Sequence, residues 1–202
     1  MIPDPVIQPS PEVALRWLRE GNRRYVEHQA KHPRQGPKAR LRVAQGQHPF
    51  AIVLGCADSR VAPEVIFDQG LGDLFVVRVA GNVVDELVVG SIEFAAEAFG
   101  VPLVVVLGHD HCGAVRAALE VFEGRGSTPG HEGALIEPIL PAVREAKGLA
   151  GDLTDLAVRI NVTNMVAKLE ADELLAPLVR SKKLKVVGGV YHLEMGKVDF
   201  IA

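Results

Sequence analysis

Four short runs of mostly apolar residues constrain the fold of this chain more than any other feature. They cover residues 50–55, 74–77, 103–108 and 185–190. A run that is apolar at almost every position, and not at alternate positions, is typical of a strand buried on both faces. Segments with helical periodicity lie between these runs. Strands that alternate with helices predict an α/β fold with a mainly parallel central sheet flanked by helices.

The helical segments differ in how much of their surface is apolar. Residues 86–99 are apolar on almost all sides, so we expect a helix buried within a packed layer. Residues 114–122 are also expected to be helical, and two longer helical stretches are expected at 135–147 and 152–179. Residues 191–200 are expected to add an edge strand or hairpin to the sheet.

The N-terminal part of the chain is expected to form a helical arm. Ser10 is a good N-cap, Pro11 suits the first helical position, and apolar residues recur behind them at helical spacing. Because a Pro- and Gly-containing basic stretch separates this helix from the first strand, we expect residues 1–45 to pack on a partner subunit. Residues 46–202 are expected to form the α/β domain.

Charge and hydropathy exclude several classes of partner. The net charge is -3, which gives no strong field to attract nucleic acid or an acidic membrane. No apolar run reaches the roughly 18–20 residues that span a bilayer. The first residues lack the pattern of a signal peptide, so a cytoplasmic location is expected, where the two cysteines stay reduced.

Potential metal ligands follow two of the predicted strands. Cys56 comes directly after the first strand, His109 follows the third, and Cys112 lies at the start of a predicted helix. The loops at the carboxyl ends of neighbouring parallel strands meet in one crevice, so we expect these side chains to lie together. Two thiolates and an imidazole suit zinc, and three protein ligands leave a fourth position open for catalysis. Taken singly, the cysteines are as well explained as small buried apolar residues.

Asp58 and Arg60 lie next to Cys56. At this spacing in an extended turn, the guanidinium can hold the carboxylate through two hydrogen bonds. Taken alone, the pair is equally well explained as an ordinary surface ion pair. Its position beside a candidate metal ligand favours a catalytic role.

Together these segments resemble the beta-class carbonic anhydrases. Residues 56–60 and 108–113 are similar to the paired C-x-D-x-R and H-x-x-C motifs of that family. The resemblance extends from Trp17 to Val198, and further family segments match in order and spacing at residues 73–78, 80–82, 90–94 and 188–191.

The resemblance implies a zinc enzyme that hydrates carbon dioxide to bicarbonate and a proton by means of a zinc-bound hydroxide. It implies that Cys56, His109 and Cys112 bind Zn²⁺ and that Asp58 and Arg60 form a catalytic dyad. The substrate-binding positions that it implies are Gln47, Phe75, Ala80, Phe94 and Gly113. It also implies a homodimer or a dimer of dimers, with Gln47 reaching the pocket across the dimer interface.

Two positions depart from the family. Val79 replaces a common asparagine, and Val53 stands where the subgroup with an inhibitory bicarbonate site has tryptophan, so we expect no such site. Three alternatives remain: a hydrolase for carbonyl sulfide or carbon disulfide on the same fold, a non-catalytic zinc-stabilised binding protein, and a cysteine-nucleophile enzyme. Five further histidines have no ligand spacing and are expected to be exposed: His28, His32, His48, His131 and His192.

Overall fold

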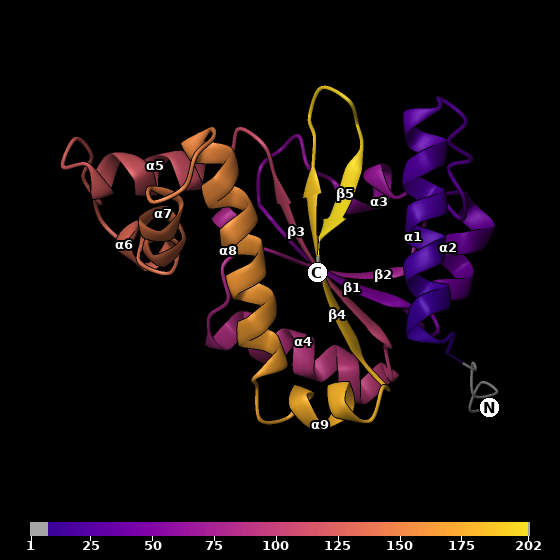
Figure 1. Ribbon diagram of the computed structural model, residues 1–202. Helices are drawn as coiled ribbons and strands as arrows, with labels where there is room; N and C mark the ends of the chain where they lie inside the picture. Colours follow the sequence, from indigo (N-terminus) through magenta and orange to yellow (C-terminus); the bar gives the residue numbers. More distant parts are fainter. Residues whose placement is uncertain (1–7, 202) are drawn as a thin grey trace.

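A computed structural model describes residues 8–201, which form a central sheet with helices on both faces (Figure 1). The five strands run in the order β2-β1-β3-β4-β5. The first four of these are parallel, and β5 pairs antiparallel with β4 at the edge. This confirms the predicted mainly parallel sheet and its C-terminal hairpin. The strands are β1 (Ala51–Gly55), β2 (Leu74–Arg78), β3 (Leu103–His109), β4 (Lys185–Tyr191) and β5 (Val198–Ile201).

Helices cover the two faces of the sheet unequally (Figure 1). On one side lie α1 (Pro11–Val26), α2 (Pro37–Val43) and α3 (Pro63–Ile66). The other side carries α4 (Glu86–Phe99), α5 (Gly113–Phe122), α6 (Gly133–Ile136), α7 (Leu140–Ala146), α8 (Leu153–Glu170) and α9 (Leu175–Arg180), and the short 3-10 helix η1 (Ala80–Asn82) follows β2. Across residues 8–201, no helix combines the length and apolar composition needed to cross a membrane.

The central strands β1, β3 and β4 bury both of their faces, whereas the edge strand β2 is only half-buried. In β1, Ile52 and Leu54 belong to the core beneath α4 and α8, whereas Ala51 and Val53 belong to a second core beneath α1 and α3. Successive side chains of a strand point to opposite faces of the sheet, so a strand covered on both sides needs an apolar residue at every position. This is why the strands are visible in the sequence as continuous apolar runs.

Capping residues fix the ends of the helices that the sequence predicted best. The Ser10 hydroxyl accepts a hydrogen bond from the Val13 amide at 3.4 Å, and α1 begins at the following proline. Asp85 caps α4 by accepting from the Val88 amide at 2.8 Å. Gly100 ends α4 in the left-handed conformation that glycine adopts without steric cost. Both helices therefore begin directly after the residue that caps them.

The two long helical stretches expected after residue 130 are each divided. Pro138 interrupts the first, which forms α6 and α7, and Pro141 lies in the first turn of α7, where proline is tolerated. In the second, the Asp172 carboxylate accepts hydrogen bonds from the amides of Leu174 and Leu175, both at 3.0 Å. These bonds end the continuous helix and start α9, so the prediction of one helix over 152–179 was wrong.

Residues 86–99 form the expected helix, α4, and within the described chain only one of its faces is buried. One face of α4 packs on the sheet, through Val88, Ile92 and Ala95. On its outer side, Leu87 is 82% exposed and Phe94 is 57% exposed. The described chain therefore leaves an apolar helix face uncovered.

The helical arm packs on its own chain. Ala14 and Leu18 of α1 are fully buried in the core that the helix shares with the sheet. Trp17 is 40% exposed and meets the edge of the Phe50 ring, with the ring centroids 5.1 Å apart. The second arm helix, α2, was not expected. Residues 1–7 of the predicted arm lie outside the described residues, and its contact with a partner subunit stays a prediction.

Candidate metal centre

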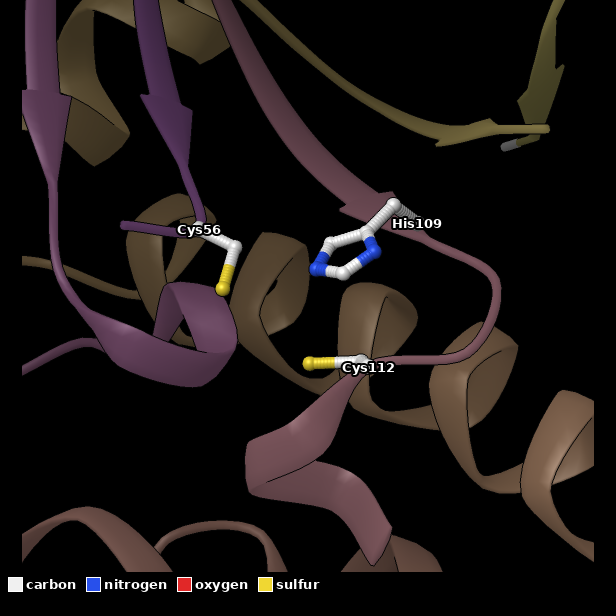
Figure 2. A group of neighbouring side chains, drawn as sticks. All are labelled: Cys56, His109 and Cys112. Carbon is white, nitrogen blue, oxygen red and sulfur yellow. The ribbon is translucent and has the colours of Figure 1, made fainter. Parts of the chain in front are cut away.

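Sheet topology brings together three side chains that are far apart in sequence (Figure 2). Cys56 directly follows β1, and His109 is the last residue of β3, the parallel neighbour of β1. Cys112 is the N-cap residue of α5. All three are buried, and their ligand atoms lie within 4.8 Å of one another. Figure 2 shows both sulfur atoms and one imidazole nitrogen converging on the same space.

The state of His109 fits a bound cation. Its Nδ1 atom lies 2.8 Å from the carbonyl oxygen of Asp110, and a carbonyl oxygen only accepts hydrogen bonds, so Nδ1 carries the proton. In the neutral imidazole that binds metals, the lone pair is therefore on Nε2. Nε2 is buried and has no hydrogen-bond partner in the described chain. A buried acceptor without a partner opposes folding, whereas a metal ion in this position would satisfy it.

The two sulfur atoms are also suited to a cation. Their hydrogen bond lowers the pKa of Cys56 to about 4, and the same interaction raises the pKa of Cys112. Metal ions bind cysteine as the thiolate, so the lowered pKa of Cys56 favours a metal ligand at this position. Zinc fits this set best, because thiolates and imidazole are its preferred ligands and three of them leave a fourth position open.

Asp58 and Arg60 form the pair that the sequence predicted. The Arg60 side chain donates to both carboxylate oxygens of Asp58, at 2.9 and 2.7 Å, and its backbone amide donates a third hydrogen bond at 3.0 Å. Asp58 Oδ2 lies 3.9 Å from His109 Nε2, so the carboxylate is beside the three ligands. The Arg60 hydrogen bonds hold the pKa of Asp58 well below its ordinary range, and the carboxylate is therefore ionised at neutral pH.

Arg78 also supports the site, although no definite role was predicted for it. Its Nε atom donates to the carbonyl oxygen of Cys56 at 2.9 Å, and its Nη2 atom donates to that of Asp58 at 2.6 Å. One guanidinium thus fixes the turn that carries Cys56 and Asp58. Its position at the carboxyl end of β2, beside the end of β1, is the signal that could have predicted this role.

The predicted pocket residues divide into two groups. Ala80 lies in η1 next to Gly81, whose amide donates to the Cys56 sulfur at 3.3 Å, and Gly113 directly follows Cys112 at the start of α5. These positions adjoin the metal ligands. In the described chain, no contact places Gln47, Phe75 or Phe94 beside the metal ligands.

Gln47 is exposed and precedes β1, so it lies at the amino end of a strand whose carboxyl end carries Cys56. A strand of this length spans roughly 16 Å. Within one chain, Gln47 therefore lies at the opposite end of the strands from the metal ligands.

Phe75 and Phe94 pack with Phe99 between β2 and α4, and the ring centroids are 5.6 to 6.4 Å apart.

The expectation that His192 is exposed was wrong. Its side chain is 17% exposed and lies between two carboxylates, 3.3 Å from Asp110 and 3.1 Å from Asp199. Asp110 is the residue whose carbonyl oxygen orients His109, so the β4–β5 hairpin contacts the loop of the metal centre. The other four histidines are exposed as predicted: His28, His32, His48 and His131.

Comparison with known proteins agrees with this arrangement. A family model described as carbonic anhydrase matches residues 51–198. Carbonic anhydrase from Mycolicibacterium smegmatis is 41% identical over 191 residues, which cover 94% of this chain and 93% of that protein. Carbonic anhydrase 2 from Mycobacterium tuberculosis is 41% identical over 192 residues, which cover 93% of this chain and 91% of the relative.

Solved structures give the same result. The beta-carbonic anhydrase CcaA superposes with a TM-score of 0.72 and 27% identity, covering 94% of this chain and 92% of the other. A beta-carbonic anhydrase from Coccomyxa, in complex with acetazolamide, has a TM-score of 0.72 and 28% identity, with 89% of this chain and 82% of the other covered.

Proposed function

The chain belongs to the beta-class carbonic anhydrase family, and from this premise we propose that Cys56, His109 and Cys112 hold the zinc ion that serves hydration of carbon dioxide. The observation that carries the proposal is the buried cluster of two sulfurs and the His109 Nε2 atom, which has no hydrogen-bond partner among residues 8–201. When bound, zinc supplies an activated water as nucleophile at neutral pH. The products are bicarbonate and a proton.

Asp58 orients the attacking water in this proposal. Its carboxylate is ionised and lies beside the ligand atom of His109, where it accepts a hydrogen bond from that water. Arg60 occupies both carboxylate oxygens and holds them in a fixed orientation. The same hydrogen bonds keep the Asp58 carboxylate from binding the metal, so the fourth coordination position of zinc would stay open for the reaction.

The substrate pocket combines apolar side chains with a backbone donor. Phe75 and Phe94 offer an apolar wall that suits carbon dioxide, and since they do not contact the ligands of their own chain, this wall belongs to the pocket of a neighbouring subunit. Ala80 is a small residue next to the ligands. The Gly113 amide belongs to the first turn of α5, where amide groups have no partner within the helix. We assign this amide to a bicarbonate oxygen.

A homodimer completes the site in this proposal. Gln47 is too far from the zinc ligands of its own chain, and it reaches a substrate only in a neighbouring subunit. The uncovered face of α4, with Leu87 and Phe94, and the half-buried edge strand β2 offer the contact surface. We also assign the protein to the cytoplasm, because both cysteines are free thiols and the metal centre requires them reduced.

Replacing Gln47 by alanine tests the shared site. We expect kcat/KM for carbon dioxide hydration to fall about 10-fold, the loss typical of one hydrogen bond to a charged group. Gln45→Ala, two residues away and equally exposed, is the matched control and leaves kcat/KM unchanged. Light scattering during the assay gives the oligomeric state. A fully active monomer would contradict the dimer and the role of Gln47.

The substrate is tested by two assays on one zinc-containing preparation. Stopped-flow spectrophotometry measures carbon dioxide hydration, and sulfide release measures hydrolysis of carbonyl sulfide and carbon disulfide. We expect fast hydration and negligible hydrolysis. Hydrolysis of the sulfur substrates without carbon dioxide hydration would replace the proposed reaction with the related hydrolase.

A further inference from the structure

Three polar contacts join α8 to the segment that follows β2. The Asn161 side-chain amide donates to the carbonyl oxygen of Gly81 at 3.0 Å. One turn later, the Met165 sulfur accepts from the Val84 amide at 3.2 Å, and Lys168 Nζ donates to the Val84 carbonyl oxygen at 2.6 Å. Residues four and then three apart lie on one face of a helix. This face of α8 therefore holds residues 81–84 in place.

Gly81 is the part of that segment which touches the metal centre. Its amide donates to the Cys56 sulfur at 3.3 Å. Gly81 has a φ of +72°, and a Cβ atom there would lie 2.7 Å from Ile139 Cδ1 and 3.1 Å from Ala114 Cβ. Glycine is required at this position, because any other side chain would be strained at this φ and would collide with Ile139. The direction of this hydrogen bond thus depends on how the η1 turn is held.

Asn161 is poorly explained as a packing residue. It is 1% exposed, its neighbours on the helix are apolar, and its Oδ1 atom has no hydrogen-bond partner in the described chain. A buried amide with an unpaired oxygen opposes folding, whereas an apolar side chain of similar shape would not. What Asn161 provides to the site is the bond to Gly81.

We propose that Asn161 is a positioning residue of the metal centre, which holds the η1 turn so that the Gly81 amide points at the Cys56 sulfur. The hydrogen bond from the Gly81 amide fixes the orientation of the Cys56 sulfur toward the metal and lowers the energy of its lone-pair electrons. Without it, the sulfur is less well placed as a ligand. Such outer hydrogen bonds tune metal affinity in other sites. The proposal rests on the zinc site proposed above.

Two substitutions separate positioning from packing. Asn161→Ala removes the amide, and Asn161→Leu removes it while keeping nearly the same side-chain shape. We expect both variants to bind zinc about 10- to 100-fold more weakly in competition with a chromophoric chelator. In the cobalt-substituted proteins, we expect the sulfur-to-cobalt charge-transfer band to move to longer wavelength, because the sulfur loses its hydrogen bond. If Asn161 only packs, leucine restores both properties.

Leu169→Ala is the matched control. Leu169 is fully buried on α8, about two turns beyond Asn161, and has no hydrogen bond to the η1 turn. This variant loses stability but keeps the zinc affinity and the cobalt band of the wild type. An Asn161→Leu variant that matches the wild type in both readouts, or that fails to fold, would overturn the proposal, and so would equal zinc loss in Leu169→Ala. Wild-type protein that binds no zinc would instead refute the zinc site itself.

Discussion

Replacing Cys112 by serine is expected to remove zinc from the protein and to abolish carbon dioxide hydration. A serine hydroxyl stays protonated at neutral pH and is a much weaker zinc ligand than a thiolate. Two ligands then remain, Cys56 and His109, and they do not enclose a tetrahedral site. We expect zinc content to fall from about one per chain to a small fraction of that, and turnover to fall by roughly 10³-fold or more.

The position of Cys112 allows the sulfur to be replaced without disturbing the start of α5. It is the N-cap of α5, and its own side chain makes no capping hydrogen bond. Serine is among the best N-cap residues, so the variant keeps or improves the helix start. Circular dichroism and thermal unfolding, compared between metal-stripped proteins, check that the fold is intact. A Cys112→Ser protein with full zinc and full activity would exclude Cys112 as a ligand.

Replacing Asp58 by asparagine is expected to separate catalysis from metal binding. The substitution preserves the shape of the side chain but removes its charge and half of its acceptor capacity. The asparagine NH2 group then faces either the attacking water or the Arg60 guanidinium, and in either orientation one favourable contact of Asp58 is lost. We expect turnover to fall by roughly 10²-fold, the typical contribution of a positioned acid–base group, while zinc content is unchanged.

A second aspartate–arginine pair offers the matched control for Asp58→Asn. Arg34 Nε donates to both carboxylate oxygens of Asp73, at 2.8 and 2.9 Å, away from the metal ligands. Asp73→Asn therefore breaks an equivalent pair without touching the site, and turnover should stay at the wild-type level. Metal analysis and stopped-flow hydration are measured on the same samples. Unchanged turnover in Asp58→Asn would remove Asp58 from the mechanism.

The sheet was predictable because its central strands, β1, β3 and β4, are buried on both faces. Continuous apolar runs identified the four parallel strands, and their order along the chain placed Cys56 and His109 at adjacent strand ends. Asp85 and Gly100 fixed both ends of α4 through local capping. The division of the 152–179 stretch was not predicted. In the sequence Asp172 resembles an ordinary surface residue, and only the structure shows its hydrogen bonds to the amides of Leu174 and Leu175.

The supporting contacts of the site were harder to predict, since they depend on packing between distant segments. Asn161 and Gly81 are 80 residues apart, and the sequence shows only a polar residue in a helical pattern. His192 lies near Asp110 because the hairpin folds back over the end of β3. For α4, apolar residues on almost all sides suggested burial, but the outer face is uncovered in the described chain. Helical periodicity shows that a face is apolar, but it does not show whether the same chain or a second subunit covers that face.

Adding zinc back to the stripped wild-type protein tests the central claim most directly. The rate of carbon dioxide hydration is measured by stopped flow after each addition of zinc. A single site made by Cys56, His109 and Cys112 predicts no appreciable activity without metal, a linear rise, and an end point at about one zinc per chain. Full hydration activity in the stripped protein, or a rate that does not follow bound zinc, would contradict the account.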